Sequence, residues 1–408
     1  MDEQQRSMTK KLILVQIFAF SSFVTVNYYN VFLKQIGFDS TQLGIWGAIT
    51  GVTGMIVLPI WGVISDKTRS AKMTFILVMI IFATIFTLVP IFGRMFSISP
   101  IPLYVLIVLY GLVKEPTHSL QDAWMISTIS PYGMSYASIR LWGSLGFGIV
   151  SIIVGLCVGS VGIDKVFLLS PICAVPAILI VWFFKESDYS KTPTVSYAKK
   201  KPEKINPIVL FKNYYYATAM IMTLALGVYM ALTSSFYAFI LDHAGVNPEM
   251  VGVLSGYGSL LQVVCMWLFT KYLKNIPMPI ILIAGGLFGV AENIMYGLAQ
   301  NLGMMFVAST LWSVGVSARV SILPSYLFSL VPREYAATAQ TLNSTVVMML
   351  TIVGNLVGGY LIANLGITKY NYCVASVQFV LVLLFALSLP FGRKVLKIEP
   401  PKSIAKTA

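Results

Sequence analysis

Residues 72–93 read KMTFILVMIIFATIFTLVPIFG, a run in which the first lysine is the only charged residue. An α-helix of this length rises about 33 Å, which is enough to cross a hydrocarbon layer of about 30 Å. Similar runs recur along the 408 residues, and 57% of the chain is hydrophobic while 11% is charged. Soluble proteins carry about 25% charged residues. The sequence therefore predicts an all-α membrane protein.

Apolar runs of similar length before and after residues 72–93 bring the number of predicted membrane-spanning helices to twelve. They are expected near residues 11–33, 41–65, 72–93, 101–127, 139–159, 164–184, 213–241, 249–270, 277–298, 303–331, 336–363 and 370–391. The first run is too long, and too polar at its end, for a cleaved signal peptide.

Basic residues predict the orientation of these helices. With a cytoplasmic N-terminus, 21 of the 28 lysines and arginines fall in cytoplasmic segments and 4 in outside loops. Such an excess is typical of the cytoplasmic side of a membrane protein. We therefore expect a multi-pass protein of the cell (plasma) membrane, surrounded by the lipid bilayer, with both termini in the cytoplasm. The net charge of +13 then reflects topology, and no nucleic-acid partner is expected.

The longest polar stretch divides the predicted helices into two sets of six. It covers residues 185–212 and is rich in lysine. We expect an N-terminal six-helix bundle over 1–184, a cytoplasmic linker over 185–212, and a C-terminal six-helix bundle with a cytoplasmic tail over 213–408. Paired halves of this kind are common in transporters, where substrate binds between the repeats.

The predicted loop between the second and third helices carries a motif. It reads Gly62-Val-Ile-Ser-Asp66-Lys67-Thr-Arg69 and resembles the signature that the major facilitator superfamily has in this loop. The resemblance implies two six-helix bundles around a central cavity, working by alternating access. Gly62, Asp66, Lys67 and Arg69 are then expected to form a conformational latch, in which Asp66 pairs with a neighbouring helix. An ordinary basic turn is the alternative interpretation.

A second resemblance is narrower. Residues 136–147 read YASIRLWGSLGF and residues 332–340 read PREYAATAQ. Both are similar to stretches in the branch that holds lactose-permease-like sugar/proton symporters, nucleoside/proton symporters and phenylpropionate-type permeases. In that branch a carboxylate on the fourth span and an arginine on the fifth help to hold substrate. Glu115 and Arg140 occupy comparable places.

Charged residues inside predicted spans point to a polar site. A charge at mid-bilayer costs at least about 2.5 kcal/mol and usually faces a cavity or a partner. On the fourth span, residues 115, 118, 119 and 122 share one helical face. They predict either a lining for substrate and protons or an ion-pair cluster that braces helices. Glu292 and Arg319, on the ninth and tenth spans, are expected to line the cavity or to pair with each other.

Aromatic and amide side chains extend this candidate site, because they suit an organic solute. The expected substrate-binding residues are Glu115, His118, Arg140, Trp142, Asn27, Tyr229, Tyr237, Trp312, Arg319 and Asn355. The expected proton-coupling residues are Glu115, Asp122 and Glu292. Tyr214, Tyr215 and Tyr216 are assigned instead to the aromatic belt at the membrane surface.

No cofactor or metal is expected. The four cysteines form no CxxC pair and the two histidines lie far apart, so neither supplies metal-ligand spacing. No GxxxxGK[ST] phosphate-binding loop occurs, so transport energy is expected from a proton gradient, with sodium as the alternative ion. No catalytic pair is visible, and we do not expect an enzyme.

The leading hypothesis is proton-coupled symport of a small organic solute such as a sugar, a nucleoside or an aromatic acid, by a monomer. The first alternative is proton-coupled efflux of drugs or lipids. It is disfavoured because the fifth span lacks the Gly-Pro element typical of such exporters. The second alternative is a membrane receptor or scaffold that transports nothing, which predicts that neutralising Glu115 leaves function intact.

Overall fold

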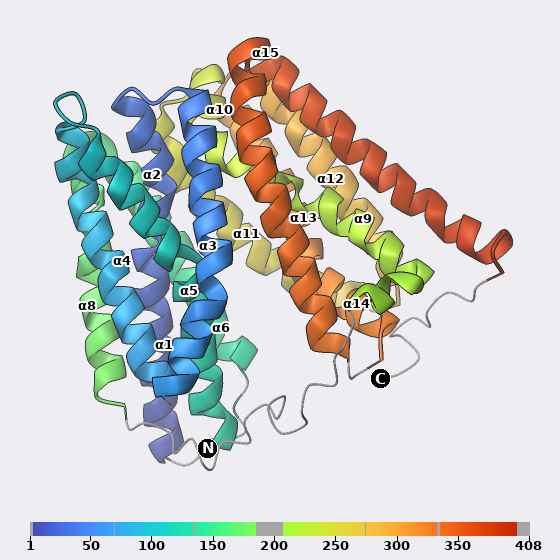
Figure 1. Cartoon of the computed structure of the whole chain (residues 1–408), viewed down its shortest axis with the longest axis horizontal. Coiled ribbons are helices and arrows are strands. Elements are labelled where there is room, and N and C mark those ends of the chain that lie inside the picture. Colours follow the sequence, from blue (N-terminus) through green and yellow to red (C-terminus); the bar gives the residue numbers. More distant parts are fainter. Residues whose placement is uncertain are drawn as a thin grey trace. The chain divides into compact units, whose positions relative to one another are not determined.

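The structure is all-helical, as the hydropathy pattern predicts. The computed structural model describes residues 3–68, 70–132, 134, 136–184, 207–273, 275–332 and 335–397. Every regular element within these ranges is a helix (Figure 1). Most of the linker predicted over 185–212 lies outside the described residues, apart from a short 3₁₀ helix near its end, η2 (Pro207–Lys212).

The described residues of the first half form eight α-helices and one 3₁₀ turn. These are α1 (Glu3–Ser22), α2 (Val24–Gln35), α3 (Ser40–Thr68), α4 (Ala71–Arg94), α5 (Ile101–Ile129), η1 (Ser130–Tyr132), α6 (Tyr136–Val161), α7 (Ile163–Val166) and α8 (Leu169–Trp182). The first predicted span, 11–33, therefore falls on α1 and α2, which are separated at Phe23.

The second half contains irregular turns between several of its helices. Its elements after η2 are α9 (Tyr214–Val228), η3 (Tyr229–Thr233), η4 (Ser234–Phe236), α10 (Tyr237–His243), η5 (Pro248–Met250), α11 (Val251–Tyr272), α12 (Met278–Leu298), α13 (Leu302–Ser317), η6 (Ala318–Ile322), α14 (Leu323–Leu330) and α15 (Ala336–Lys394). The turns η3 and η6 are π-helical.

The number of membrane crossings is only partly visible in these elements. Ten helical segments among the described residues are long and apolar enough to cross a bilayer. α5 has 29 residues but is not one of the ten, and it contains Lys114, Glu115 and Asp122. α15 runs for 59 residues, yet Gly366 within it has φ 74° and ψ 168°, a conformation that only glycine adopts readily. Figure 1 shows α15 as two long rods that meet at a bend. A count of twelve crossings stays a prediction.

Contacts divide the chain into two compact units. Unit 1 comprises Met1–Phe38, Ile49–Lys204 and Glu249–Gly256, and unit 2 comprises Asp39–Ala48, Ile205–Pro248 and Tyr257–Ala408. Each unit is therefore built mainly from one half of the chain, with a short piece of the other half packed into it.

Unit 1 has an aromatic core between α1, α2, α4 and α5. Phe82 and Phe86 are fully buried, and their rings lie 4.7 Å apart. Phe23 meets Phe82 at 4.9 Å, and Tyr29 meets Tyr110 at 5.1 Å. Because lipid tails are as apolar as these rings, such helices are held by close packing rather than by hydrophobic burial. Two of the buried phenol oxygens, those of Tyr29 and Tyr110, have no hydrogen-bond partner in the described part of the chain.

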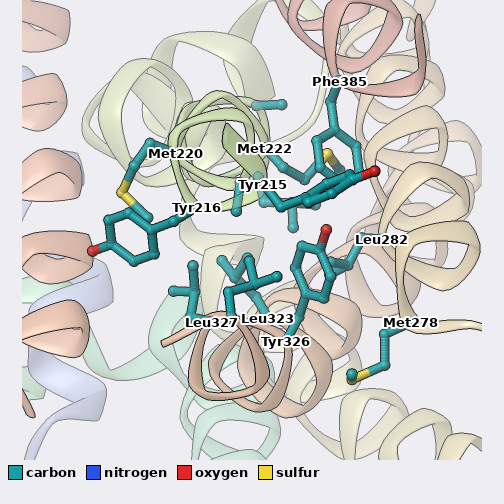
Figure 2. Packing of buried hydrophobic residues seen from close by; sticks show 14 of the residues in the cluster. Tyr215, Tyr216, Met220, Met222, Met278, Leu282, Leu323, Tyr326, Leu327 and Phe385 are labelled. Atoms are coloured by element: carbon teal, nitrogen blue, oxygen red, sulfur yellow. The ribbon is translucent and has the colours of Figure 1, made fainter. Parts of the chain in front are cut away.

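Unit 2 has a core of large side chains from α9, α12, α14 and α15. Figure 2 shows Tyr215 close to Tyr326 and Phe385, with Leu282 beside them. Tyr215 is 3% exposed and Tyr216 is fully buried, with its hydroxyl donating to the backbone oxygen of Ala339 at 3.2 Å. The assignment of these two tyrosines to the membrane-surface belt is therefore wrong. They begin α9 at a place where α14 and α15 cover it.

Candidate substrate site

A small, partly open pocket in unit 2 lies among α9, η3, α12, α13, η6 and α15. It is lined by Leu226, Tyr229, Met230, Gly285, Gly289, Glu292, Trp312, Gly315, Val316, Arg319 and Gln378. Four residues that the sequence assigned to the site thus meet here: Tyr229, Glu292, Trp312 and Arg319. They come from four different elements, so no single sequence window contains the pocket.

Two π-helical turns place side chains at this pocket. η3 supplies Tyr229 and Met230, and η6 supplies Arg319. A π turn is rare, and it often marks a functional site because it breaks the regular α pattern of side-chain directions. Both turns therefore coincide with the lining.

Glycines allow the helices around the pocket to approach closely. A methyl group on Gly285 would lie 2.5 Å from Cβ of Ala318, and one on Gly289 would collide with Nε2 of Gln378. Gly315 faces Gly285 across the same contact, where an added methyl group would lie 3.1 Å from the Gly285 carbonyl oxygen. The absence of side chains on these three residues leaves room both for the α12–α13 contact and for the pocket.

The ionisable groups of the pocket do not pair with each other. Glu292 is 2% exposed, and its Oε1 has no hydrogen-bond partner among the described residues. Arg319 takes part in none of the ion pairs found there within 4.0 Å. The expectation that Glu292 and Arg319 form a bridge across the second half is thus not met in this structure. The pocket instead contains a separate acid and a separate cation.

The aromatic side of the pocket consists of Tyr229 and Trp312. Their ring centroids are 5.5 Å apart and the rings are tilted by 55°. The indole Nε1 of Trp312 is buried and has no acceptor among the described residues. A buried indole N–H usually has a partner, so this donor is free for a ligand.

Hydrogen bonds fix the opposite wall of the pocket. Gln378 of α15 donates from Nε2 to the backbone oxygen of Ala225 at 3.0 Å, and its Oε1 accepts from Asn293 Nδ2 at 2.9 Å. Asn293 is fully buried; it also donates to the Gly289 carbonyl and accepts from Thr233 Oγ1 at 3.2 Å. Sequence reasoning missed Gln378. The signal was present, since a lone amide within an apolar run of a span is costly unless it is bonded.

A chain of phenols leads away from Glu292. Tyr296, one turn further along α12, donates its hydroxyl hydrogen bond to Glu292, and Tyr237 is bonded to both Tyr296 and Ser309. Tyr296 is 1% exposed and Tyr237 is 8% exposed. Tyr237, expected to bind substrate directly, is therefore not part of the pocket lining and instead contacts the residues behind Glu292.

A second polar cluster lies in unit 1, around Phe20 of α1. The Arg140 guanidinium carbon is 3.8 Å from the Phe20 ring centroid, a cation–π contact. Arg140 Nε is 3.9 Å from Oδ1 of Asp122, which also accepts from the Tyr136 hydroxyl at 2.5 Å. The carboxylate within ion-pair distance of Arg140 is thus that of Asp122. Both side chains of this pair are about one-third exposed or more.

His118 and Glu115 continue this cluster along α5. The His118 ring stacks on Phe23 at 4.0 Å and lies 5.6 Å from Phe20. Glu115 Oε1 is 3.7 Å from Lys114 Nζ, and its side chain is 46% exposed. His118, Asp122 and Arg140 therefore meet around Phe20, while the ion-pair partner of Glu115 is its own neighbour in sequence.

The other predicted binding residues lie apart from these two groups. Asn27 has a buried Nδ2 without a partner in the described part of the chain, and Trp142 is 43% exposed on α6. Asn355 is 2% exposed and packs against Gly47, where an added methyl group would lie 2.9 Å from the Asn355 Cγ. Asn355 thus sits at a close helix contact of unit 2 outside the pocket.

The predicted latch residues lie at the end of α3. Gly62, Asp66 and Lys67 are exposed, and Asp66 forms no ion pair with any described residue. Arg69 lies outside the described residues, as do Arg333 and Glu334 of the second resembling stretch. The latch therefore stays a prediction. Among the residues that the structure covers, no group of three or more His, Cys, Asp and Glu side chains could hold a metal ion.

Comparison with known proteins assigns this helical architecture to a family. The model of the MFS_1 like family matches residues 10–373. The chain belongs to this family. It is therefore a membrane transporter of the major facilitator kind, as the motif at Gly62–Arg69 predicts.

Two bacterial relatives and one solved structure illustrate the likeness. The chain is 21% identical over 362 residues to the uncharacterized transporter YwbF of Bacillus subtilis (strain 168), covering 88% of this chain and 83% of the relative. It is 20% identical over 345 residues to the maltose permease of Geobacillus stearothermophilus, covering 82% of each. The crystal structure of nucleoside transporter NupG superimposes with a TM-score of 0.76 at 14% identity, covering 93% of this chain and 98% of that one. These relatives are transporters, which confirms that the chain is not an enzyme.

Proposed function

We propose that this major facilitator protein is a secondary active transporter that takes up a small organic solute together with a proton, by alternating access. The observation that carries the proposal is the unit 2 pocket, where Arg319 has no ion-pair partner and Glu292 has a buried, unpartnered oxygen among the described residues. Ionisable side chains inside membrane spans are costly and are usually kept for substrates or protons.

The proposed substrate is a sugar, a nucleoside or an aromatic acid. Tyr229 and Trp312 offer aromatic surface on which a flat or ring-shaped solute can pack. Maltose permease and nucleoside transporter NupG are the names of two similar proteins, and they support a polar organic solute as cargo here.

Glu292 is the proposed proton carrier of the pocket. Its side chain is almost completely buried and, among the described residues, has no cation within 4.0 Å, so a proton is the natural way to neutralise its charge. Glu115 and Asp122 are proposed as further proton-exchanging groups in unit 1, with His118 and Arg140 beside them as polar contacts for substrate. Sodium remains the alternative coupling ion.

We propose a topology of twelve membrane crossings, with the two arms of α15 counted separately and α5 included. Both termini lie in the cytoplasm of this proposed plasma-membrane monomer. Residues 1–184 and 213–408 act as the two halves, joined by the linker 185–212. The loop Gly62–Arg69 acts as the latch.

Transport in proteoliposomes tests this function. Purified protein is reconstituted with a pH-sensitive dye inside, an inward proton gradient is imposed, and labelled sugars, nucleosides and aromatic acids are supplied outside. We expect one of these classes to accumulate with acidification of the lumen, and a protonophore to abolish the accumulation. Accumulation that acidifies nothing would contradict proton symport, and movement of no solute would contradict transport of this substrate range.

A further inference from the structure

We infer that the unit 2 pocket is a carboxylate subsite, in which Arg319 binds the acid group of the substrate while Tyr229 and Trp312 contact a flat apolar body. This inference rests on the proposed function and narrows it, from three solute classes to organic acids with an aromatic or similarly flat frame. Three features of the lining support this inference. Its free polar groups are mainly hydrogen-bond donors, most of its hydrogen-bond acceptors are occupied, and its other side chains are apolar.

The free polar groups of the pocket are mainly hydrogen-bond donors. Arg319 presents a guanidinium fork that no described carboxylate occupies within 4.0 Å. Trp312 adds a buried N–H that has no acceptor among the described residues. An arginine fork matches the two oxygens of a carboxylate and binds them more strongly than it binds neutral acceptors.

The acceptors of the pocket are largely occupied. Gln378 faces the pocket, but its Oε1 already accepts from Asn293 and its Nε2 already donates to Ala225. Glu292 therefore offers the one side-chain carboxylate oxygen of the described lining that is without a partner. A sugar presents many hydroxyl groups, each of which is a donor that needs an acceptor. Glu292 and the Tyr229 hydroxyl are the side-chain acceptors that the described lining offers to such donors, whereas a carboxylate brings acceptors only and matches the Arg319 and Trp312 donors.

The remaining side chains of the lining are apolar. Leu226, Met230 and Val316 contribute aliphatic surface next to the aromatic pair. Ligand sites usually combine an apolar lining with a few polar groups that fix orientation. The pocket thus suits a solute with one charged end and one flat apolar end.

Charge balance gives this inference a second consequence. An acid anion that enters with one proton carries no net charge across the membrane, whereas a neutral sugar with one proton carries one positive charge. A membrane potential acts on a moving charge with about 2.3 kcal/mol per 100 mV. Uptake of the acid is therefore expected to respond to a pH gradient and to be indifferent to an imposed potential.

Ligand binding to the purified full-length protein tests the subsite. The probes are benzoate, phenylacetate and 3-phenylpropionate, each compared with its primary amide, together with maltose and uridine. We expect at least one acid to raise the thermal unfolding midpoint and its amide to have no effect. Arg319→Gln is expected to weaken acid binding by about 10- to 100-fold, with a smaller loss for Arg319→Lys.

Two control variants separate local effects from general ones. Lys369→Gln removes a cation from an exposed position of α15, and Trp267→Phe changes a 55% exposed indole of α11. Neither is expected to alter acid binding, whereas Trp312→Phe is expected to weaken it. A variant that fails to fold is recognised by a lowered unfolding midpoint without ligand. If Arg319→Gln fails in this way, acid binding is compared between the wild-type protein and Arg319→Lys, which keeps the charge.

The outcomes distinguish this inference from the transport proposal. Equal binding of an acid and its amide, binding of maltose or uridine with the same dependence on Arg319, or failure of every acid overturns the carboxylate subsite. In the first two cases transport of a solute stands. Uptake in proteoliposomes that an imposed potential drives as strongly as a pH gradient also overturns it. If no acid, sugar or nucleoside is bound or moved, the proposed function itself fails.

Discussion

Glu292 differs from the two other carboxylates assigned to proton coupling in its surroundings. The side chains of Glu115 and Asp122 are 46% and 40% exposed, and each lies within 4.0 Å of a cation. Glu292 is 2% exposed and pairs with no cation in the described part of the chain. A group that is buried and uncompensated gains most from binding a proton, so Glu292 is the better candidate for coupling.

Replacing Glu292 by glutamine should separate solute movement from proton movement. The amide keeps the shape of a protonated carboxyl and its bond to Tyr296 while losing the ability to release a proton. We expect Glu292→Gln to lose proton-driven accumulation in proteoliposomes but to retain exchange of labelled for unlabelled solute. Asp164→Asn, which changes an ion pair with Arg94 outside the pocket, is the control. Full accumulation by Glu292→Gln would remove Glu292 from the coupling mechanism.

Asn293 is expected to matter for stability rather than for chemistry. Its side chain bonds Gln378, the Gly289 carbonyl and Thr233, so Asn293→Ala leaves several buried polar groups unsatisfied. Such a loss costs about 1–3 kcal/mol. The thermal unfolding midpoint should fall clearly, whereas it should hardly change for Asn364→Ala, where the amide bonds only its own helix at an exposed site. Equal shifts for the two variants would argue against this network.

Helix α12 depends on glycine for its approach to α15 and α13. A methyl group at Gly289 would collide with Gln378 Nε2, and Gln378 cannot move without breaking its bonds to Ala225 and Asn293. We expect Gly289→Ala to destabilise the protein by about 1–3 kcal/mol through overpacking, and to weaken solute binding. Gly159→Ala, where the nearest atom would be 3.6 Å away, should be neutral or slightly stabilising. A neutral Gly289→Ala would mean that α12 and α15 can separate at little cost.

Hydrophobic run length predicts the helices well but not their breaks. The run over 72–93 corresponds to α4 (Ala71–Arg94), because any apolar segment of this length must satisfy its backbone as a helix in lipid. The gap predicted between residues 363 and 370 is not an extended loop: helix continues on both sides of Gly366. The π turns η3 and η6 lie inside longer apolar runs, so hydropathy predicts a helix there without showing that its turn is widened.

Charge inside a span predicts which residues of the site matter, but it does not predict their partners. Glu292 and Arg319 stand out as charges within apolar runs, and both line the pocket. Their lack of mutual contact, and the role of Gln378, depend on how α12, α13 and α15 pack. That packing is decided by small residues such as Gly285 and Gly289, whose effect is steric and is invisible in a single sequence.

The fold of the whole chain survives large changes in sequence. NupG shares 14% identity with this chain and still superimposes over 93% of it. A bilayer-spanning bundle requires long apolar helices and small residues at their contacts, and many sequences meet that requirement. The fold does not require particular residues in the pocket, so proteins that share this fold can bind different substrates.

The predicted orientation of the whole molecule can be checked by cysteine accessibility. In a variant whose four native cysteines are replaced, Asn301→Cys lies in a predicted outside loop and Lys271→Cys at a predicted cytoplasmic helix end. A membrane-impermeant maleimide applied to intact cells should label residue 301, and should label residue 271 only after permeabilisation, because basic residues gather on the cytoplasmic side. The reverse pattern would invert the topology.

The π turns have a consequence for how proteins of this family can diverge. A π turn holds one residue more than an α turn, so deleting a residue within η3 would restore α-helical geometry at that turn and rotate the residues on its two sides by about 100° relative to each other around the helix axis. The side chains before the deleted position would then point in new directions relative to the side chains after it. We therefore expect a one-residue deletion inside this membrane span, usually regarded as a lesion, to change how Tyr229 and Met230 face the pocket that they line, without a single substitution.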